Sequence, residues 1–192
     1  MHRSRSVAGL VERLSHCTYG EAYRHGLNPA QWSALRYFSN ANRFSKTTSA
    51  FARYQGITRG AASQTISALV QKRLLKRDRD KVDKRQYNLC LTAKAEKLTV
   101  DDPIRPLVDA AFELGDGERA ATRDALEKML VHVLREKGEA YFGYCNDCRF
   151  LQCVRGKGQS PDAFRCTNLQ QPLTADDLKK MCINFARNEL PA

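Results

Sequence analysis

The 192-residue sequence has no apolar run long enough to cross a membrane and no continuous apolar stretch near its start. A transmembrane helix needs about 20 mostly apolar residues, and a secretory signal peptide needs an unbroken apolar segment. We therefore expect a cytoplasmic protein with no membrane partner. The sequence also lacks a glycine-rich phosphate loop and pairs no cysteine with a convincing histidine base, so we do not expect an enzyme.

Acidic residues are few relative to basic ones. The chain has 32 Lys and Arg against 21 Asp and Glu, which gives a formal net charge of +11. Such an excess favours a polyanionic partner or an anionic membrane surface. Because no amphipathic basic anchor accompanies the charge, the balance indicates nucleic acid rather than a membrane.

Apolar spacing and capping residues predict four helices in the first 75 residues. A first helix is expected over residues 6–25, and a second begins at Pro29. A third is expected over residues 48–54, and a fourth runs from Thr58 to about Leu75. The third and fourth are joined by a tight turn that contains glycine, which is the pattern of a helix-turn-helix.

A highly charged turn follows over residues 76–85, and then Tyr87, Leu89 and Leu91 alternate as in a strand. This pattern predicts a basic hairpin, or wing, directly after the helix-turn-helix. A helix fits the DNA major groove, while cations beside it neutralise phosphates or enter a minor groove. The residues expected to contact double-stranded DNA are Arg59, Ser63, Gln64, Thr65 and Ser67 on the fourth helix and Arg77, Arg79, Lys81, Lys84 and Arg85 in the wing.

Several short segments carry a family resemblance. They are residues 48–52, 56–58, 61–63, 74–77, 83–85 and 91–92, and the most specific is the wing triplet Asp83-Lys84-Arg85 followed by Leu91-Thr92. With these segments, the chain resembles the multiple-antibiotic-resistance regulator (MarR) family over roughly residues 27–137.

The resemblance implies an obligate homodimer built from the N-terminal helix and two long later helices. It also implies binding to a pseudo-palindromic operator, with Asp83 orienting Arg85 toward the minor groove. The sequence departs from the family at Ala95 and Arg73, which stand where glycine is usual. We expect both departures to be tolerated, because helix-compatible residues replace the glycines.

Residues 92–137 predict two long amphipathic helices, the first interrupted near Asp102-Pro103 and the pair separated near residues 115–117. From Gly138 onward the composition changes to Gly, Asn, Gln and Cys. One last helix is expected there, opened by Thr174 and carrying Leu178, Met181, Cys182 and Phe185 on one face. The expected division is an N-terminal dimerisation helix (1–28), a winged helix-turn-helix (29–92), dimerisation helices (93–138) and a cysteine-rich extension (139–192).

Four of the seven cysteines form a candidate metal site. Cys145 and Cys148 are two residues apart, a spacing whose turn directs both sulfurs at one ion, and Cys166 and Cys182 complete a C-x2-C-x17-C-x15-C pattern. Cys153 is an alternative ligand, because C-x2-C-x4-C is also a run of the iron-sulfur type. Structural disulfides are not expected in a reducing compartment. Cys17 is similar to the N-terminal-helix cysteine of the peroxide-sensing branch of the family, but we favour a packed thiol there, and Cys90 is expected to have no chemistry.

The type of metal is left open by this spacing. Structural zinc ribbons normally have two C-x2-C knuckles, whereas one knuckle with two isolated cysteines is common among iron-sulfur sites. We therefore favour a 2Fe-2S or 4Fe-4S cluster, with zinc as the alternative because it needs only four thiolates.

Taken together, the sequence predicts a mainly α protein: a winged helix-turn-helix with long dimerisation helices and a small cysteine-rich C-terminal extension. The expected function is that of a homodimeric, sequence-specific transcriptional regulator, a repressor, whose operator binding is controlled by an iron-sulfur cluster acting as a redox sensor. The alternative is a similar regulator with structural zinc, controlled by a small aromatic ligand or by thiol oxidation.

Overall fold

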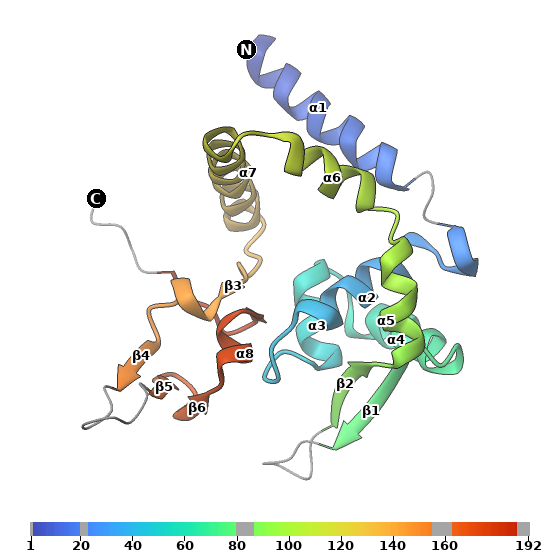
Figure 1. Ribbon diagram of the computed structural model, residues 1–192, viewed down its shortest axis with the longest axis vertical. Coiled ribbons are helices and arrows are strands. Elements are labelled where there is room, and N and C mark those ends of the chain that lie inside the picture. The colour runs from blue at the N-terminus through green and yellow to red at the C-terminus, as the bar shows by residue number, and fades with distance from the viewer. Residues whose placement is uncertain (1, 20–22, 80–86, 155–162, 188–192) are drawn as a thin grey trace.

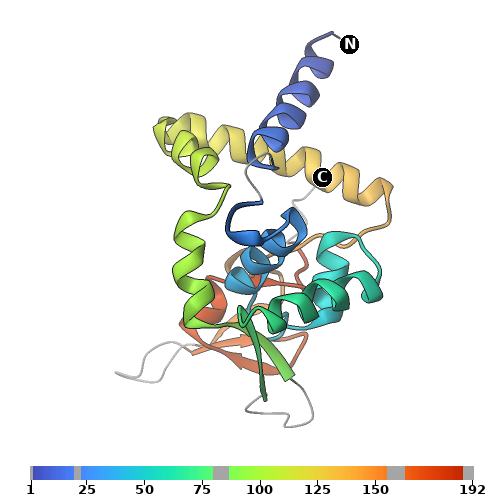
Figure 2. The same ribbon diagram turned by 90° about the vertical axis from the view of Figure 1, so that its right-hand side faces the viewer.

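The computed structural model describes residues 2–19, 23–79, 87–154 and 163–187. It is mainly helical, as expected, and divides into three parts (Figure 1). The winged helix-turn-helix and the residues after Gly138 lie next to each other, and an arm of long helices extends beyond them at one end of the molecule (Figure 1). Figure 2 shows the wing and the C-terminal strands at the end opposite the arm.

The winged helix-turn-helix consists of α2 (Pro29–Asn40), α3 (Thr48–Gln55), α4 (Arg59–Gln71), β1 (Leu75–Arg79) and β2 (Tyr87–Leu91). Trp32, Leu35, Phe38, Phe51 and Ile66 are at most 1% exposed and form the centre of its core. Burial of several such side chains, each contributing about 1.5–3 kcal/mol, is the main term that holds the helices together.

Side-chain caps fix where these helices begin. Asn28 and Gln31 form a capping box at α2, and the hydroxyls of Thr47 and Thr58 accept from the backbone of α3 and α4. Gly56 ends α3 with a φ of 62°, a left-handed conformation that glycine adopts without strain. The predicted starts of the second, third and fourth helices are therefore confirmed within a residue.

The end of α4 differs from the prediction. The helix ends at Gln71 rather than near Leu75, because Arg73 adopts a φ of 57° and Leu75 already belongs to β1. The N–H of Leu74 closes the turn on the carbonyl of Leu69 at 2.9 Å. The expectation that Arg73 is helix-compatible is therefore wrong: it holds a left-handed turn position with a side chain that disfavours it.

The arm contains α1 (His2–Tyr19), α6 (Arg105–Glu113) and α7 (Asp116–Glu136). The first predicted helix begins earlier than expected, at His2, and is described to Tyr19, while His25 belongs to a separate 3-10 turn, η1 (Arg24–Gly26), before α2. The helix predicted after the wing divides into α5 (Ala93–Leu98), the 3-10 turn η2 (Thr99–Asp101) and α6, with its interruption at Asp102-Pro103 as expected. Arg36 on α2 pairs with Asp102 at 2.7 Å and so fixes this corner to the winged helix.

The extension after Gly138 is built mainly of strands. β3 (Gly143–Tyr144) pairs antiparallel with β7 (Met181–Cys182), while β4 (Leu151–Val154), β5 (Ala163–Cys166) and β6 (Gln171–Leu173) form a three-stranded sheet. A 3-10 turn, η3 (Cys145–Asp147), follows β3. A methyl group on Gly143 would lie 2.7 Å from the Phe185 ring, so only glycine allows this approach of β3 to the C-terminal segment.

The predicted last helix is wrong beyond its first turn. Thr174 does cap a helix, but α8 (Ala175–Leu178) has four residues, and Met181 and Cys182 form a strand. The apolar spacing fits a helix, yet the backbone of this segment pairs with residues distant in the sequence. Gly143 pairs with Cys182, and the carbonyl of Met181 accepts from the N–H of Asn42 at 2.8 Å.

The left-handed Arg73 gives a test of the fold. We expect Arg73→Gly to stabilise the protein by about 0.5–1 kcal/mol, because it removes roughly 1–2 kcal/mol of backbone strain and adds a smaller entropic cost of roughly 0.5–1 kcal/mol. Urea unfolding followed by circular dichroism measures this. Gln71→Gly, two residues earlier inside α4, is the matched control and should destabilise by up to about 1 kcal/mol. Destabilisation by both substitutions would contradict the strained turn.

Candidate nucleic-acid interface and cysteine cluster

The outer face of α4 is polar and open to solvent. Arg59, Ser63 and Gln64 are exposed, while Ala62, Ile66 and Leu69 of the same helix are buried. The Thr65 hydroxyl donates to the carbonyl of Ala61 at 3.2 Å, and Ser67 is half-buried near the start of the wing. Of the five residues predicted to contact DNA from this helix, Arg59, Ser63 and Gln64 are therefore the most accessible.

The wing carries its cations on a regular antiparallel ladder. Arg77 pairs in register with Leu89 and Arg79 with Tyr87, and both arginines are exposed. The Arg79 guanidinium lies 5.9 Å from the centre of the Tyr87 ring and donates to its hydroxyl at 3.3 Å, which holds it on the strand. The predicted contacts Lys81, Lys84 and Arg85, and the orienting Asp83, lie outside the described residues.

The four cysteines of the predicted metal site are all buried. Cys145, Cys148, Cys166 and Cys182 are between 5% and 9% exposed, and three of them share an apolar cluster with Leu173 and Leu178. Cys153 is exposed on β4 and Cys17 is exposed on α1, while Cys90 is half-buried in β2. Cys17 is therefore not the packed thiol that the sequence suggested, within this single chain.

Three elements position the four ligand candidates. Cys145 begins the turn η3, in which the N–H of Cys148 donates to the carbonyl of Cys145 at 3.1 Å, as expected for a knuckle. Cys166 ends β5, where it pairs with Leu151, and Cys182 lies in β7. The tie from the C-terminal segment to the knuckle is thus made by a strand and not by a helix.

Cys145 and Cys182 interact directly. The Cys145 thiol donates a hydrogen bond to Cys182, which lowers the pKa of Cys182 to about 6 and raises that of Cys145. Hydrogen bonds from the Asn42 side chain and from the backbone of Asn184 also lower the pKa of Cys182, against the opposing effect of burial. A buried sulfur that favours the thiolate is suited to be a metal ligand or a redox thiol.

The donor chemistry suits a soft metal centre, since all four cysteines are buried and three of them share one apolar cluster. Among the described residues, however, no group of three or more His, Cys, Asp or Glu side chains has the arrangement of a metal shell. The metal site remains a prediction, in which Cys145 and Cys182 are a hydrogen-bonded pair.

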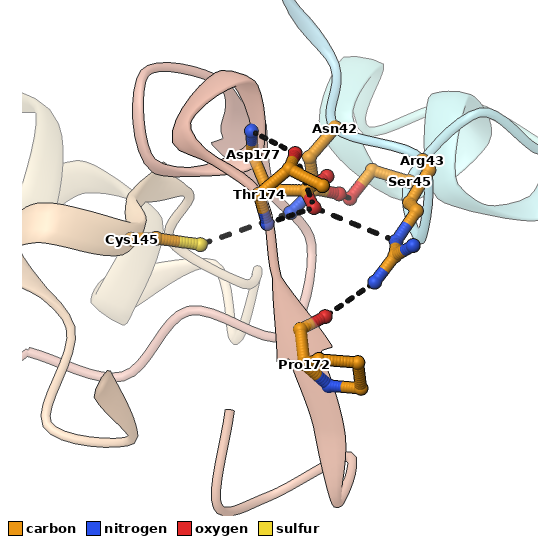
Figure 3. A network of polar contacts seen from close by, with 7 residues as sticks. All are labelled: Asn42, Arg43, Ser45, Cys145, Pro172, Thr174 and Asp177. Atoms are coloured by element: carbon orange, nitrogen blue, oxygen red, sulfur yellow. Dashed lines mark hydrogen bonds and ion pairs between the residues drawn. The ribbon is translucent and has the colours of Figure 1, made fainter. Parts of the chain in front are cut away.

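Sequence reasoning missed two polar residues of this site, Asn42 and Ser45. Both lie in the loop between α2 and α3 and are 1% exposed, and the Asn42 amide lies 3.9 Å from the Cys145 sulfur (Figure 3). They are about 100 residues before Cys145, and no local pattern relates them to it. The one feature that could have indicated Asn42 and Ser45 is that both are polar residues in a loop that the helices bury.

A second missed contact joins the extension to α7. Residues 181–187, here called the C-terminal strap, end at Arg187, whose guanidinium pairs with Glu127 of α7 at 2.8 Å. The Tyr141 hydroxyl also donates to Glu127, which raises the pKa of Tyr141 to about 12 together with burial, the larger cause. Arg187 forms a β-bridge with Cys148, so the strap connects the knuckle to the arm.

None of the helices among the described residues is long and apolar enough to span a membrane. A family model described as MarR family matches residues 25–86. A comparison with curated proteins found no match.

Solved structures resemble the fold over about two thirds of the chain. A MarR/EmrR family transcriptional regulator from Acinetobacter sp. ADP1 has 18% identity and a TM-score of 0.53, covering 70% of this chain and 96% of its own. A MarR transcriptional regulator from Methanosarcina mazei Go1 has 22% identity and a TM-score of 0.52, covering 70% and 97%. A MarR family protein from Bacillus stearothermophilus has 14% identity and a TM-score of 0.52, covering 69% and 93%. Residues 25–86 therefore match the MarR family model, and the solved structures share the winged helix-turn-helix fold.

Proposed function

We propose that the protein is a homodimeric, sequence-specific DNA-binding transcriptional regulator. The observation that carries the proposal is the exposed polar face of α4, directly beside a strand pair that bears exposed arginines, in a chain of net charge +11. In this arrangement α4 enters the major groove, where Gln64 and Ser63 meet base edges. Arg77 and Arg79 bind the backbone or the adjacent minor groove and supply most of the affinity.

The arm supports assembly into a dimer. In α1, Val7, Leu10, Val11 and Leu14 are exposed at helical spacing, and in α7 the same holds for Leu126, Met129, Leu130 and Val133. Two apolar stripes of this kind are seldom left in water. A second copy of the chain would cover them and place two α4 helices about 34 Å apart, which matches the half-sites of a pseudo-palindromic operator. We propose that the protein bound there acts as a repressor.

The cysteine cluster supports control by a metal centre. Cys145, Cys148, Cys166 and Cys182 would hold an iron-sulfur cluster, or zinc as the alternative, and such a centre supplies redox sensitivity or a structural crosslink. Its ligands connect through the strap to Glu127 on α7 and through Asn42 to the winged helix. A change at the sulfurs would therefore alter the angle between the arm and the DNA-reading elements, on which simultaneous contact with two half-sites depends.

The DNA-reading assignment predicts different effects for two substitutions. Gln64→Ala should weaken binding to a duplex selected from a random library by about 1–3 kcal/mol while leaving binding to mixed-sequence DNA unchanged, because base contacts carry specificity. Arg79→Ala should weaken both and lower the salt dependence by about one phosphate contact. Fluorescence anisotropy titrations at several salt concentrations measure these effects. Arg123→Ala, an exposed arginine on α7, should change neither, and equal effects of all three would overturn the assignment.

The dimer is tested on α7. Leu130→Glu places a charge in the apolar stripe and should convert the protein to a monomer in sedimentation velocity, since burying an unpaired carboxylate is costly. Lys128→Glu, on the opposite side of the same helix, should leave the dimer intact. If wild type is itself monomeric at micromolar concentration, the homodimer is refuted.

The metal centre is tested by the visible spectrum with iron, sulfide and zinc analysis of protein purified without oxygen. Iron with acid-labile sulfide and broad visible absorption would support a cluster, and one zinc per chain in a colourless protein would support the alternative. Cys148→Ser should lose the metal and change affinity for the selected duplex, whereas Cys153→Ser should keep both because Cys153 is exposed outside the buried cluster. A wild-type protein that contains no metal would refute the metal centre. If Cys148→Ser loses the metal without a change in DNA affinity, the centre is structural only.

A further inference from the structure

The loop between α2 and α3, residues 41–47, enters the cysteine cluster from the winged helix. Ala41 forms a β-bridge with Met181, and the N–H of Asn42 donates to the carbonyl of Met181 at 2.8 Å. Asn42 and Ser45 are polar side chains, yet both are 1% exposed. Buried polar groups need hydrogen-bond partners, so the partners of these two side chains show what the site requires of them.

The hydrogen bonds of Asn42 fix the orientation of its amide. Its oxygen accepts from the Ser45 hydroxyl at 2.7 Å, which leaves the nitrogen to face Cys145, 3.9 Å from that sulfur (Figure 3). The Ser45 hydroxyl oxygen in turn accepts from the N–H of Ile183 at 2.9 Å, directly after Cys182. The winged helix thus supplies a side-chain donor to a sulfur of the extension.

The same loop is bonded to the DNA-reading elements. The Tyr37 hydroxyl on α2 donates to the carbonyl of Ser45 at 2.7 Å. The carbonyl of the next residue, Lys46, accepts from the N–H of Leu89 in β2 at 2.8 Å. A continuous series of hydrogen bonds and one peptide link therefore runs from Cys145 through Asn42 and Ser45 to the wing.

Other contacts hold the extension in place without involving sulfur. The Arg43 guanidinium donates to the carbonyl of Pro172 and pairs with Asp177 at 3.5 Å (Figure 3). Lys180 donates to the carbonyl of Ser39 at 2.8 Å. Because these contacts remain when Asn42 is changed, the extension should stay docked. The role of Asn42 is thereby separable from docking.

We propose that Asn42 is a positioning residue that couples the state of the Cys145 sulfur to the wing. The proposal rests on the metal binding proposed above. An N–H donor bonds more strongly to a metal-bound thiolate than to a neutral thiol, because the acceptor then carries charge. Metal binding would draw Asn42 toward the sulfur and fix Ser45 and Lys46, and with them the wing strand; metal loss would release this constraint. Partners of metal ligands commonly alter metal affinity by about 10–100-fold.

The experiment compares wild type, Asn42→Ala and Asn42→Asp, with Asn40→Ala as the matched control at an exposed position of α2. Each protein is loaded with zinc, or with iron and sulfide if wild type holds a cluster. Metal content, metal affinity by chelator competition, and affinity for the selected duplex with and without metal are measured. Asn42→Asp keeps the acceptor for Ser45 but replaces the donor to sulfur, and circular dichroism shows that each variant is folded.

We expect both Asn42 variants to hold the same amount of metal as wild type at saturation, but with an affinity for metal about 10-fold or more lower. The ratio of their DNA affinities with and without metal should approach one. Asn40→Ala should behave as wild type. If either Asn42 variant has the metal affinity of wild type and the same ratio of DNA affinities with and without metal, the coupling through Asn42 is overturned while the proposed metal control stands. A wild-type ratio of one would overturn the proposed metal control, and with it the coupling. If Asn42→Ala is unfolded, Asn42→Asp decides by the same two criteria.

Discussion

The arrangement of this protein depends on an exchange of buried side chains between two hydrophobic cores. Ile183 of the strap is buried in the core of the winged helix, with Met181 and Phe142 packed against it. In the opposite direction, Phe44 from the α2–α3 loop packs into the cysteine cluster. Interiors are close-packed, so neither core can shift without disturbing the other. The extension is therefore an integral part of the fold and packs directly on the winged helix.

Local signals in the sequence predicted much of the winged helix. Asn28, Thr47 and Thr58 mark helix starts because capping is a contact over three residues, which a sequence displays directly. The end of α4 was mispredicted at Arg73. A left-handed turn position is normally recognised in a sequence by a glycine, whereas here an arginine occupies it. Its conformation follows from the need to begin β1 at Leu75, which tertiary packing imposes.

The extension was harder to predict because its structure is made by distant pairs. Leu178, Met181, Cys182 and Phe185 have helical spacing, but their backbone partners, Gly143 and Asn42, are about 40 and 140 residues away. The C-x2-C spacing did predict the turn at Cys145, whereas the role of the four buried cysteines as metal ligands stays a prediction. Asn42 and Ser45 could not be assigned to the site, since neither has a spacing relation to any cysteine.

The strap explains how a small site could affect binding over a long distance. One end of it is bonded to the α2–α3 loop through Met181 and Ile183, and the other is paired with Glu127 on α7 through Arg187. Nonspecific binding to DNA would follow from the net charge of +11 and would not require a fixed shape. Specific binding to two half-sites at once would require a fixed distance between the two recognition helices. A centre that sets the angle between the arm and the wing would therefore change specific binding far more than nonspecific binding.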